Sequence, residues 1–405
     1  MKTQMTSHAT GAVSGTAPVA SAGPAHAALA LGAFAIGTAE FATMSFLPAF
    51  TAAFGADAPA GGHVVSAYAL GVVVGAPLLT MAAARMDRRR LLLLLLSWFA
   101  LGNVLSALAH SLNSLLVLRF LTALPHGGYF GVAIVCAVGM APPERHGAAV
   151  GRVMTGLALA TVTGVPLASF ISQWLGWRQG FGAIGMLTLA AVILTGCVLP
   201  PQAAAANASA RREIGALRRP QVWLSLAIGA IGFGGLFAVY TYLTSALLAL
   251  GHATSAMVAL ILAIFGAGMA AGNFLAPRLA RLGTMPAAAL FFAWSALALA
   301  CYPLAVPHAW PISLCVFAIG IGGGLGTILQ MRLMEVAGDA QLLAGSLNHA
   351  AFNVANALGP WLGGMAIGAG YGWESTGWVG CALALGGLAV WCVAAWLARR
   401  SHTAG

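Results

Sequence analysis

Long apolar stretches separated by short polar segments run along most of this chain. Most are near the roughly 20 residues with which an α-helix crosses the hydrocarbon core of a bilayer. Residues 91–96 and 184–199 are apolar on nearly every face, so the alternating strands of a membrane β-barrel do not fit. The pattern predicts twelve helices, at residues 27–50, 63–84, 91–110, 115–141, 148–171, 179–199, 221–249, 255–277, 284–305, 310–333, 342–369 and 376–398.

The composition favours the same interpretation. Charged residues make up 6% of the 405 positions and hydrophobic residues 60%, whereas a soluble domain carries about 25% charged residues. A soluble fold could not bury so much apolar surface. The six cysteines all lie in apolar stretches without metal-ligand spacing, so we expect neither a metal site nor a disulfide framework.

A polar segment with two prolines, an alanine run and four arginines divides the predicted helices into two sets of six. We expect a cytoplasmic tail at 1–26, a six-helix bundle at 27–199, a cytoplasmic linker at 200–220, a second six-helix bundle at 221–398 and a tail at 399–405. The first tail is expected to be disordered. A cleaved signal peptide is the alternative, but no continuous apolar stretch precedes its possible cleavage site.

The two halves also share sequence patterns. The fifth and eleventh predicted helices both carry a glycine closely followed by a proline, and the second and eighth both carry spaced glycines before an arginine-bearing loop. Such a repeat is typical of transporters whose substrate site lies at the middle of the membrane, between the halves. Chance similarity among glycine-rich helices is the alternative.

The basic residues predict the orientation. If the N-terminus is cytoplasmic, sixteen of the 18 Lys and Arg residues fall in cytoplasmic segments, with Arg178 outside and Arg119 inside the fourth helix. Positive charge in short loops marks the cytoplasmic side. We therefore expect an inner-membrane protein with both termini in the cytoplasm. The net charge of +10 belongs to these loops, so no nucleic-acid partner is expected.

Ionisable residues inside predicted helices are rare, and such residues usually face a cavity or a partner. Glu40, near the middle of the first helix, is predicted to bind and release the transported proton; a structural carboxyl is the alternative. His126 lies at a similar depth in the fourth helix and could assist it, unless it is a hydrogen-bonded core residue. Arg119 lies about 10 Å farther out. It either faces the cavity or reaches the outer membrane surface.

Four further residues are candidates for the wall of the cavity. Tyr240 and Tyr242 in the seventh helix and Gln330 in the tenth could bind a solute or simply pack. Asn353 is the fourth candidate. It belongs to a polar run in the eleventh helix that consists of Asn348, His349, Asn353 and Asn356. Hydrogen bonds between helices are the simpler explanation of this run.

Proline removes a backbone hydrogen bond from a helix and bends it. We expect Gly164 and Pro166, together with Gly359 and Pro360, to support a movement of the two halves; ordinary packing is the alternative. Lys2 is the only lysine, so the chain has no Walker-type phosphate loop. We expect no enzymatic activity and no cofactor, and we expect the energy to come from a gradient.

Three segments of this chain resemble the drug:proton antiporter-1 branch of the major facilitator superfamily. They read GTAEFATM at 37–44, YALGVVVGAP at 68–77 and PHGGYFG at 125–131. Within that branch the chain is similar to arabinose-efflux-permease-like and chloramphenicol-exporter-like proteins, over residues 27–398. The resemblance implies the twelve-helix major facilitator fold and alternating access.

Family motifs also fall on single residues of this chain. The fourth-helix motif begins at Arg119, and the fifth-helix antiporter motif falls on Gly156, Gly164 and Pro166. The loop motif between helices two and three departs from the family, because its Asp-Arg pair falls on Ala84-Arg85. Asp87 could replace the missing acid of the cytoplasmic gate loop, beside Arg85 and Arg88.

Together these features predict a secondary-active transporter that exports a small sugar-like or amphipathic solute in exchange for protons. We expect it to work as a monomer in the lipid bilayer. An importer of the same fold and a membrane sensor that transports nothing are the alternatives. The direction of solute movement distinguishes the importer, and the lack of any sizeable predicted soluble domain argues against the sensor.

Overall fold

The computed structural model describes residues 22–83, 86–202, 218–250, 254–337 and 341–403, and every regular element in these ranges is a helix. The α-helices are α1 (Ala22–Ser45), α2 (Leu47–Phe54), α3 (Ala58–Ala83), α4 (Arg88–Ala107), α5 (Leu112–Gly139), α6 (His146–Leu159), α7 (Val165–Leu175), α8 (Trp177–Val198), α10 (Pro220–Gly232), α11 (Gly234–Ala249), α12 (Ser255–Leu279), α13 (Thr284–Ala305), α14 (Ala309–Ile321), α15 (Leu325–Ala337), α16 (Gln341–Gly368) and α17 (Ser375–Thr403). The shorter elements are η2 (Pro143–Arg145), η3 (Ala160–Gly164), η5 (Ala280–Leu282) and η6 (Gly322–Gly324).

Eleven helical stretches within the described ranges are long and apolar enough to cross a membrane. They correspond to eleven of the twelve predicted helices. The remaining prediction corresponds to α16, which is long enough but carries the polar run that includes His349 and Asn353. At the N-terminus, α1 begins at Ala22, inside the segment that was expected to be a tail.

The fifth predicted helix is divided by one wide turn. A π-helical turn at η3 separates α6 from α7, and the N–H of Val165 bonds to the carbonyl oxygen of Ala160. Pro166, the second residue of α7, has no N–H to donate to the preceding turn. A π turn of this kind changes the direction of a helix locally, so the backbone is irregular where the glycine and proline pattern predicted a bend.

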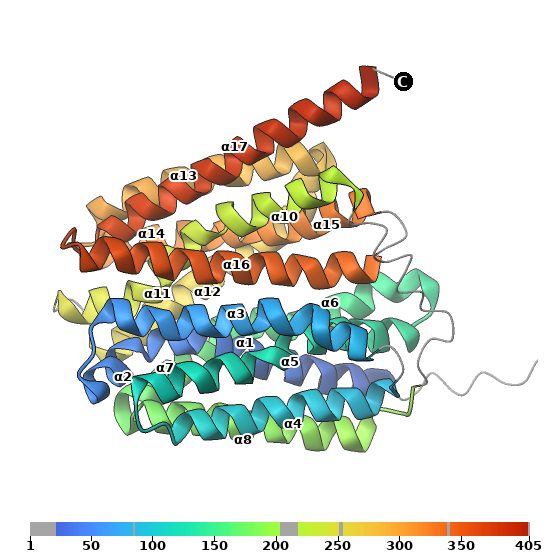
Figure 1. Ribbon diagram of the computed structural model, residues 1–405, viewed down its shortest axis with the longest axis horizontal. Helices are drawn as coiled ribbons and strands as arrows, with labels where there is room; N and C mark the ends of the chain where they lie inside the picture. Colours follow the sequence, from blue (N-terminus) through green and yellow to red (C-terminus); the bar gives the residue numbers. More distant parts are fainter. Residues whose placement is uncertain (1–21, 84–85, 203–217, 251–253, 338–340, 404–405) are drawn as a thin grey trace, which may run out of the picture.

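Both ends of the described chain lie at the same end of the molecule, on the right in Figure 1. Hydrogen bonds hold this region together: His26 of α1 bonds to Ala137 of α5, and Gln221 of α10 bonds to Ala394 of α17. We call it the terminal end. At the opposite end, here called the far end, the start of α3 meets α11 and the last turns of α16.

Helices α1 to α8 fill the lower part of Figure 1, and α10 to α17 fill the upper part. The two parts meet at several helix contacts, among them that of α5 with α16. On one side, α3 packs along α16, and the hydroxyl of Ser66 donates to the carbonyl oxygen of Ala357 at 3.0 Å. On another, α12 packs against η3 and α7. In the middle, α1 contacts α11.

Equivalent helix contacts recur in the two parts. The indole N–H of Trp98 in α4 donates to the carbonyl oxygen of Leu121 in α5, at 3.0 Å. In the second part, the indole of Trp294 in α13 donates to Ala318 in α14, at 2.7 Å. Trp294 and Ala318 follow Trp98 and Leu121 by 196 and 197 positions. The internal repeat therefore extends from sequence to hydrogen bonding.

The spaced glycines repeat in the same register. A β-carbon at Gly75 of α3 would collide with the carbonyl oxygen of Leu124 in α5. At the position 197 residues later, a β-carbon at Gly272 of α12 would collide with the carbonyl oxygen of Ile321 in α14. Both glycines thus allow two backbones to approach closely, as small residues do between membrane helices.

Candidate functional site

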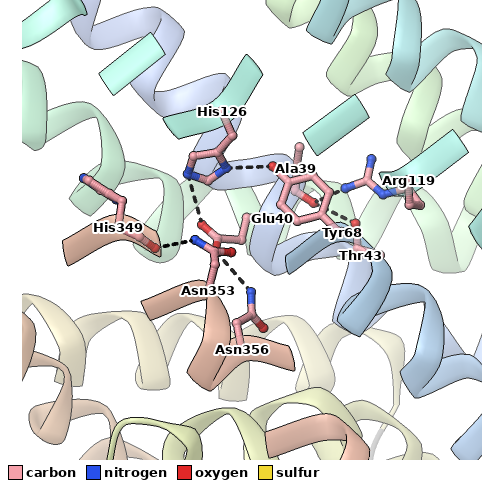
Figure 2. A network of polar contacts seen from close by, with 9 residues as sticks. All are labelled: Ala39, Glu40, Thr43, Tyr68, Arg119, His126, His349, Asn353 and Asn356. Carbon is pink, nitrogen blue, oxygen red and sulfur yellow. Dashed lines mark hydrogen bonds and ion pairs between the residues drawn. The ribbon is translucent and has the colours of Figure 1, made fainter. Parts of the chain in front are cut away.

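Glu40 lies between three helices that come from both parts of the molecule. The residue is 8% exposed. The amide Nδ2 of Asn356 in α16 donates to its Oε1 at 3.1 Å, and Nε2 of His126 in α5 lies 3.9 Å from its Oε2 (Figure 2). The structure thus brings together Glu40 and His126, whose similar depths the sequence predicted.

The start of α5 sets the positions of two of the site residues. Ser111 and Ser114 form a reciprocal capping box that begins the helix. Arg119 and His126 follow seven residues apart, about two helical turns, so they lie on one face. The hydroxyl of Tyr68 in α3 lies 2.9 Å from Nδ1 of His126. His126 therefore has polar neighbours on both ring nitrogens, which is the arrangement that a proton carrier needs.

Arg119 points into the protein and is fully buried. Its Nη1 donates to Oδ1 of Asn103 at 3.0 Å, and its Nη2 donates to the carbonyl oxygen of Ala39 at 3.3 Å. Its guanidinium carbon lies 4.4 Å from the ring centroid of Tyr68. Burial and these contacts show that the alternative of an arginine reaching the membrane surface is wrong. Arg119 lies behind Tyr68, as seen from Glu40 in Figure 2.

One face of α16 completes the polar group. His349, Asn353 and Asn356 are four and three residues apart, which places them on one side of the helix. Nδ2 of Asn353 donates to the carbonyl oxygen of His349 at 3.0 Å. The amide oxygens of Asn353 and Asn356 are buried and have no hydrogen-bond partner among the described residues. Both can accept a hydrogen bond from a solute or a water.

Aromatic rings adjoin this polar group. Phe41, the residue after Glu40, lies 6.1 Å from Phe237 and 5.8 Å from Tyr240, measured between ring centroids. Tyr240 stacks on Phe265 of α12 at 4.2 Å. Of the predicted cavity residues, Tyr240 and Asn353 therefore lie beside or within the Glu40 group.

The other two predicted cavity residues lie elsewhere. The hydroxyl of Tyr242 donates to the carbonyl oxygen of Pro360 at 2.7 Å, and its ring fits against Gly62 at the far end. Tyr242 therefore connects α11, α16 and the start of α3. Gln330 lies half-buried in α15 and makes none of the hydrogen bonds around Glu40.

The predicted hinge glycines lie at close helix contacts. A β-carbon at Gly156 would collide with the carbonyl oxygen of Ala30 in α1, and one at Gly164 would collide with the hydroxyl of Thr38. Gly359 meets the backbone of Gly234 in the same way. Packing accounts for these glycines in this structure, and their part in a movement stays a prediction.

In the predicted gate loop, Asp87 bonds to backbone groups of the first part of the molecule. Its Oδ1 accepts from the N–H of Arg90 at 3.0 Å and caps α4, while its Oδ2 accepts from the N–H of Gln202 at 3.0 Å. The N–H of Arg88 donates to the carbonyl oxygen of Gln202 at 3.0 Å. Arg85 lies outside the described residues. The loop is thus tied to the segment after α8, and a gating role for Asp87 stays a prediction.

Tyr68 and Asn103, which bond to His126 and Arg119, were not singled out by the sequence prediction. Asn103 is an amide in an otherwise apolar stretch, which is a signal that could have identified it. Asn356 belongs to the polar run for which hydrogen bonds between helices were the simpler explanation, and its bond to Glu40 joins two helices. The described residues contain no group of three or more His, Cys, Asp or Glu side chains that could hold a metal ion.

Comparison with known proteins shows which family and which relatives the chain is similar to. The sequence pattern of the Major Facilitator Superfamily matches residues 29–341. The chain is 37% identical to the inner membrane transport protein YdhP of Escherichia coli (strain K12), over 86% of this chain and 90% of that protein. It is 31% identical to a chloramphenicol resistance protein of Streptomyces lividans, over 84% of this chain and 88% of that protein.

A solved structure shares the fold. It belongs to a bacterial homologue of the human lysosomal transporter Spinster, in an inward-facing and occupied conformation. The TM-score is 0.71 at 16% identity, and the match covers 94% of this chain and 98% of that chain.

Proposed function

This chain belongs to the major facilitator superfamily of membrane transporters, and we propose that it exports a small solute in exchange for protons. The observation that carries the proposal is the position of Glu40. A charged group at the centre of a membrane helix costs about 2.5–3.5 kcal/mol on insertion scales. A carboxyl that is buried there among exchangeable polar partners is suited to bind a proton and release it again.

The bond between Glu40 and Asn356 couples the proton to the arrangement of the molecule. Ionised Glu40 accepts a charge-assisted hydrogen bond from α16, which is stronger than a bond between neutral groups. Protonation weakens this bond between the two parts of the chain. The protonation state of Glu40 therefore biases the balance between two arrangements of the halves, which is how a bound proton drives alternating access.

We further propose that the transporter has twelve spanning helices in two bundles and works as a monomer. In this arrangement α16, the eleventh helix in chain order, is added to the eleven spans to make twelve, and its polar face borders the cavity. The first bundle extends from α1 to α8 and the second from α10 to α17. The repeated tryptophan bonds and glycine contacts support two related bundles, because equivalent helices pack in the same way in each.

The solute site lies between the aromatic rings beside Glu40 and the polar face of α16. Phe41 and Tyr240 offer apolar ring surface, and the amide oxygens of Asn353 and Asn356 offer hydrogen-bond acceptors. Such a site fits a solute with an apolar part and hydroxyl or N–H groups, either sugar-like or amphipathic. The chloramphenicol resistance relative supports the amphipathic class.

Transport by inverted membrane vesicles tests this proposal. Vesicles that contain the protein are energised to an acidic lumen and supplied with radiolabelled chloramphenicol, arabinose and a panel of related solutes. We expect a solute to accumulate in the lumen and a protonophore to abolish the accumulation. A proton moving down about 100 mV supplies roughly 2.3 kcal/mol, which supports up to about fiftyfold accumulation of a neutral solute. Accumulation only in right-side-out vesicles would identify an importer instead.

A further inference from the structure

We propose that His349 is a second proton carrier, which passes the proton of Glu40 toward the terminal end of the molecule. This inference rests on the proposed proton exchange at Glu40. His349 belongs to α16, whereas Glu40 and His126 belong to α1 and α5. The proton would therefore cross from one part of the molecule to the other as it leaves.

The ring of His349 is held in a defined place. It stacks on Phe130 of α5, with 4.9 Å between centroids and 17° between planes. Its centroid lies 6.3 Å from that of His126. Figure 2 shows His349 on one side of Glu40, with Tyr68 and Arg119 on the other. The three groups Glu40, His126 and His349 thus form a short series.

The series leads toward the terminal end. Along α16, which begins at that end, His349 lies seven residues before Asn356, or about 10 Å at the helical rise. Along α5, Phe130 lies four residues closer to the same end than His126 does. His349 is half-buried, whereas Glu40 and His126 are 8% and 1% exposed. His349 therefore occupies the more accessible position between Glu40 and the terminal end.

A water molecule can carry the proton between the rings of His126 and His349. The centroids of the His126 and His349 rings lie 6.3 Å apart, which is too far for a direct hydrogen bond between their nitrogens, so the relay requires a bridging water. Asn353 lies between His349 and Asn356 on the same face of α16. Its amide oxygen is buried and has no partner among the described residues, so it can accept a hydrogen bond from that water.

The proton step balances without a further reactant. Protonated Glu40 loses one proton and becomes a carboxylate, and the imidazole of His349 gains one and becomes an imidazolium. The imidazolium then releases the proton to water at the terminal end and is neutral again. Histidine suits this step because one ring nitrogen can accept a proton while the other gives one up.

His126 of α5 lies 6.3 Å from His349, measured between ring centroids, and Glu40 of α1 lies 3.9 Å from Nε2 of His126. Among the other helices packed against α16, α10 carries no ionisable side chain over Pro220–Gly232. Tyr68 of α3 is bonded to His126, and Arg332 of α15 pairs with Glu335. Tyr242 of α11 lies toward the far end, whereas Tyr240 packs against Phe41 and Phe265. The arginines of α17 lie at the terminal end.

The test follows the proton on Glu40 directly and needs no solute. The full-length protein is reconstituted in vesicles, the pH outside is raised rapidly, and infrared spectroscopy records loss of the carboxyl band that is absent in Glu40→Gln. We expect His349→Gln and His349→Ala to keep the band but to slow its loss by about a hundredfold. Millimolar imidazole should restore the rate in His349→Ala, because a soluble imidazole can replace the missing carrier.

His26→Gln is the matched control. This buried histidine bonds to the carbonyl oxygen of Ala137, away from Glu40, and its replacement should leave the rate unchanged. An unchanged rate in both His349 variants overturns the relay and leaves proton exchange at Glu40 intact. A slowed rate that imidazole does not restore shows that His349 has only a structural role. If Glu40→Gln does not remove a pH-dependent carboxyl band, the proposed function fails and the relay fails with it.

Discussion

Arg119 carries its positive charge into the interior and bonds two neutral oxygens there, those of Asn103 and Ala39. The rings of Tyr68 and Phe181 lie 4.4 and 5.0 Å from its guanidinium carbon. The bond to Ala39 fixes the backbone directly before Glu40. Arg119 therefore positions the segment that carries the proposed proton site and does not itself touch the carboxyl.

Because the guanidinium of Arg119 is planar, we predict that even the conservative change to lysine lowers the stability of the protein. In Arg119→Lys, a single ammonium group cannot bond both oxygens and stack on both rings. We expect the free energy of unfolding to fall by about 2 kcal/mol, because a buried bond to a charged group is lost. Thermal unfolding of the purified protein measures this. Arg152→Lys, at an exposed position of α6, is the control. Equal unfolding temperatures for Arg119→Lys and the wild type would contradict the contacts described.

Counting residues along predicted helices was enough to place Glu40 and His126 at one level, because helical rise converts sequence position into depth. It could not give the direction in which a side chain points. For that reason the sequence left two directions open for Arg119, and it assigned Tyr242 to the cavity although its hydroxyl bonds to Pro360 at the far end. The contact of Asn356 with Glu40 depends on how α1 and α16 pack together. A single sequence does not reveal which faces of two helices far apart in the chain come into contact.

At the scale of helices, the closest contacts depend on glycines, which have no side chain to keep two backbones apart. We predict that Gly75→Ala and Gly272→Ala each destabilise the protein by about 1–3 kcal/mol, because the added methyl group forces two backbones apart. Gly131→Ala in α5 is the control, since no atom lies within 4 Å of the added carbon. It should be neutral or stabilising by about 0.5–1 kcal/mol. Thermal unfolding measures these differences. Equal unfolding temperatures for all three variants would contradict the close approach of the helix backbones at Gly75 and Gly272.

The π turn before Pro166 allows a separate test of the hinge. Pro166→Ala restores a backbone donor and favours a straighter helix at the contact between η3 and α12. We expect this variant to reach the membrane and to bind solute while its net export falls. Pro277→Ala, at an exposed proline inside α12, should export normally. Export at the wild-type rate by Pro166→Ala would mean that packing alone explains the glycine and proline pattern.

At the scale of the whole molecule, the sequence predicted the helices well because bilayer thickness fixes their length. All twelve predicted stretches correspond to helices, and eleven qualify as spans by length and composition. Breaks within helices were harder to predict. The interruption between α10 and α11 at Phe233 has no proline within it and is flanked by Gly232 and Gly234.

The orientation in the membrane is a further prediction at this scale. Because the arginines gather at the terminal end, reporter fusions after Arg219 and after Arg400 should both give cytoplasmic signals. A fusion after His308, in the connection between α13 and α14 at the far end, should give a periplasmic signal. A periplasmic signal from either of the first two fusions would contradict the predicted orientation.

The central claim is that Glu40 couples solute export to protons, and one comparison tests it most directly. Purified wild type and Glu40→Gln are reconstituted in vesicles with the solute found in the vesicle panel. Exchange of labelled for unlabelled solute is then measured beside accumulation driven by a pH gradient. Glu144→Gln, the same change at an exposed acid near the terminal end, serves as the control. We predict that Glu40→Gln keeps exchange, because the amide preserves the shape of the site, and loses gradient-driven accumulation. Accumulation against a gradient by Glu40→Gln at the wild-type level would contradict the account.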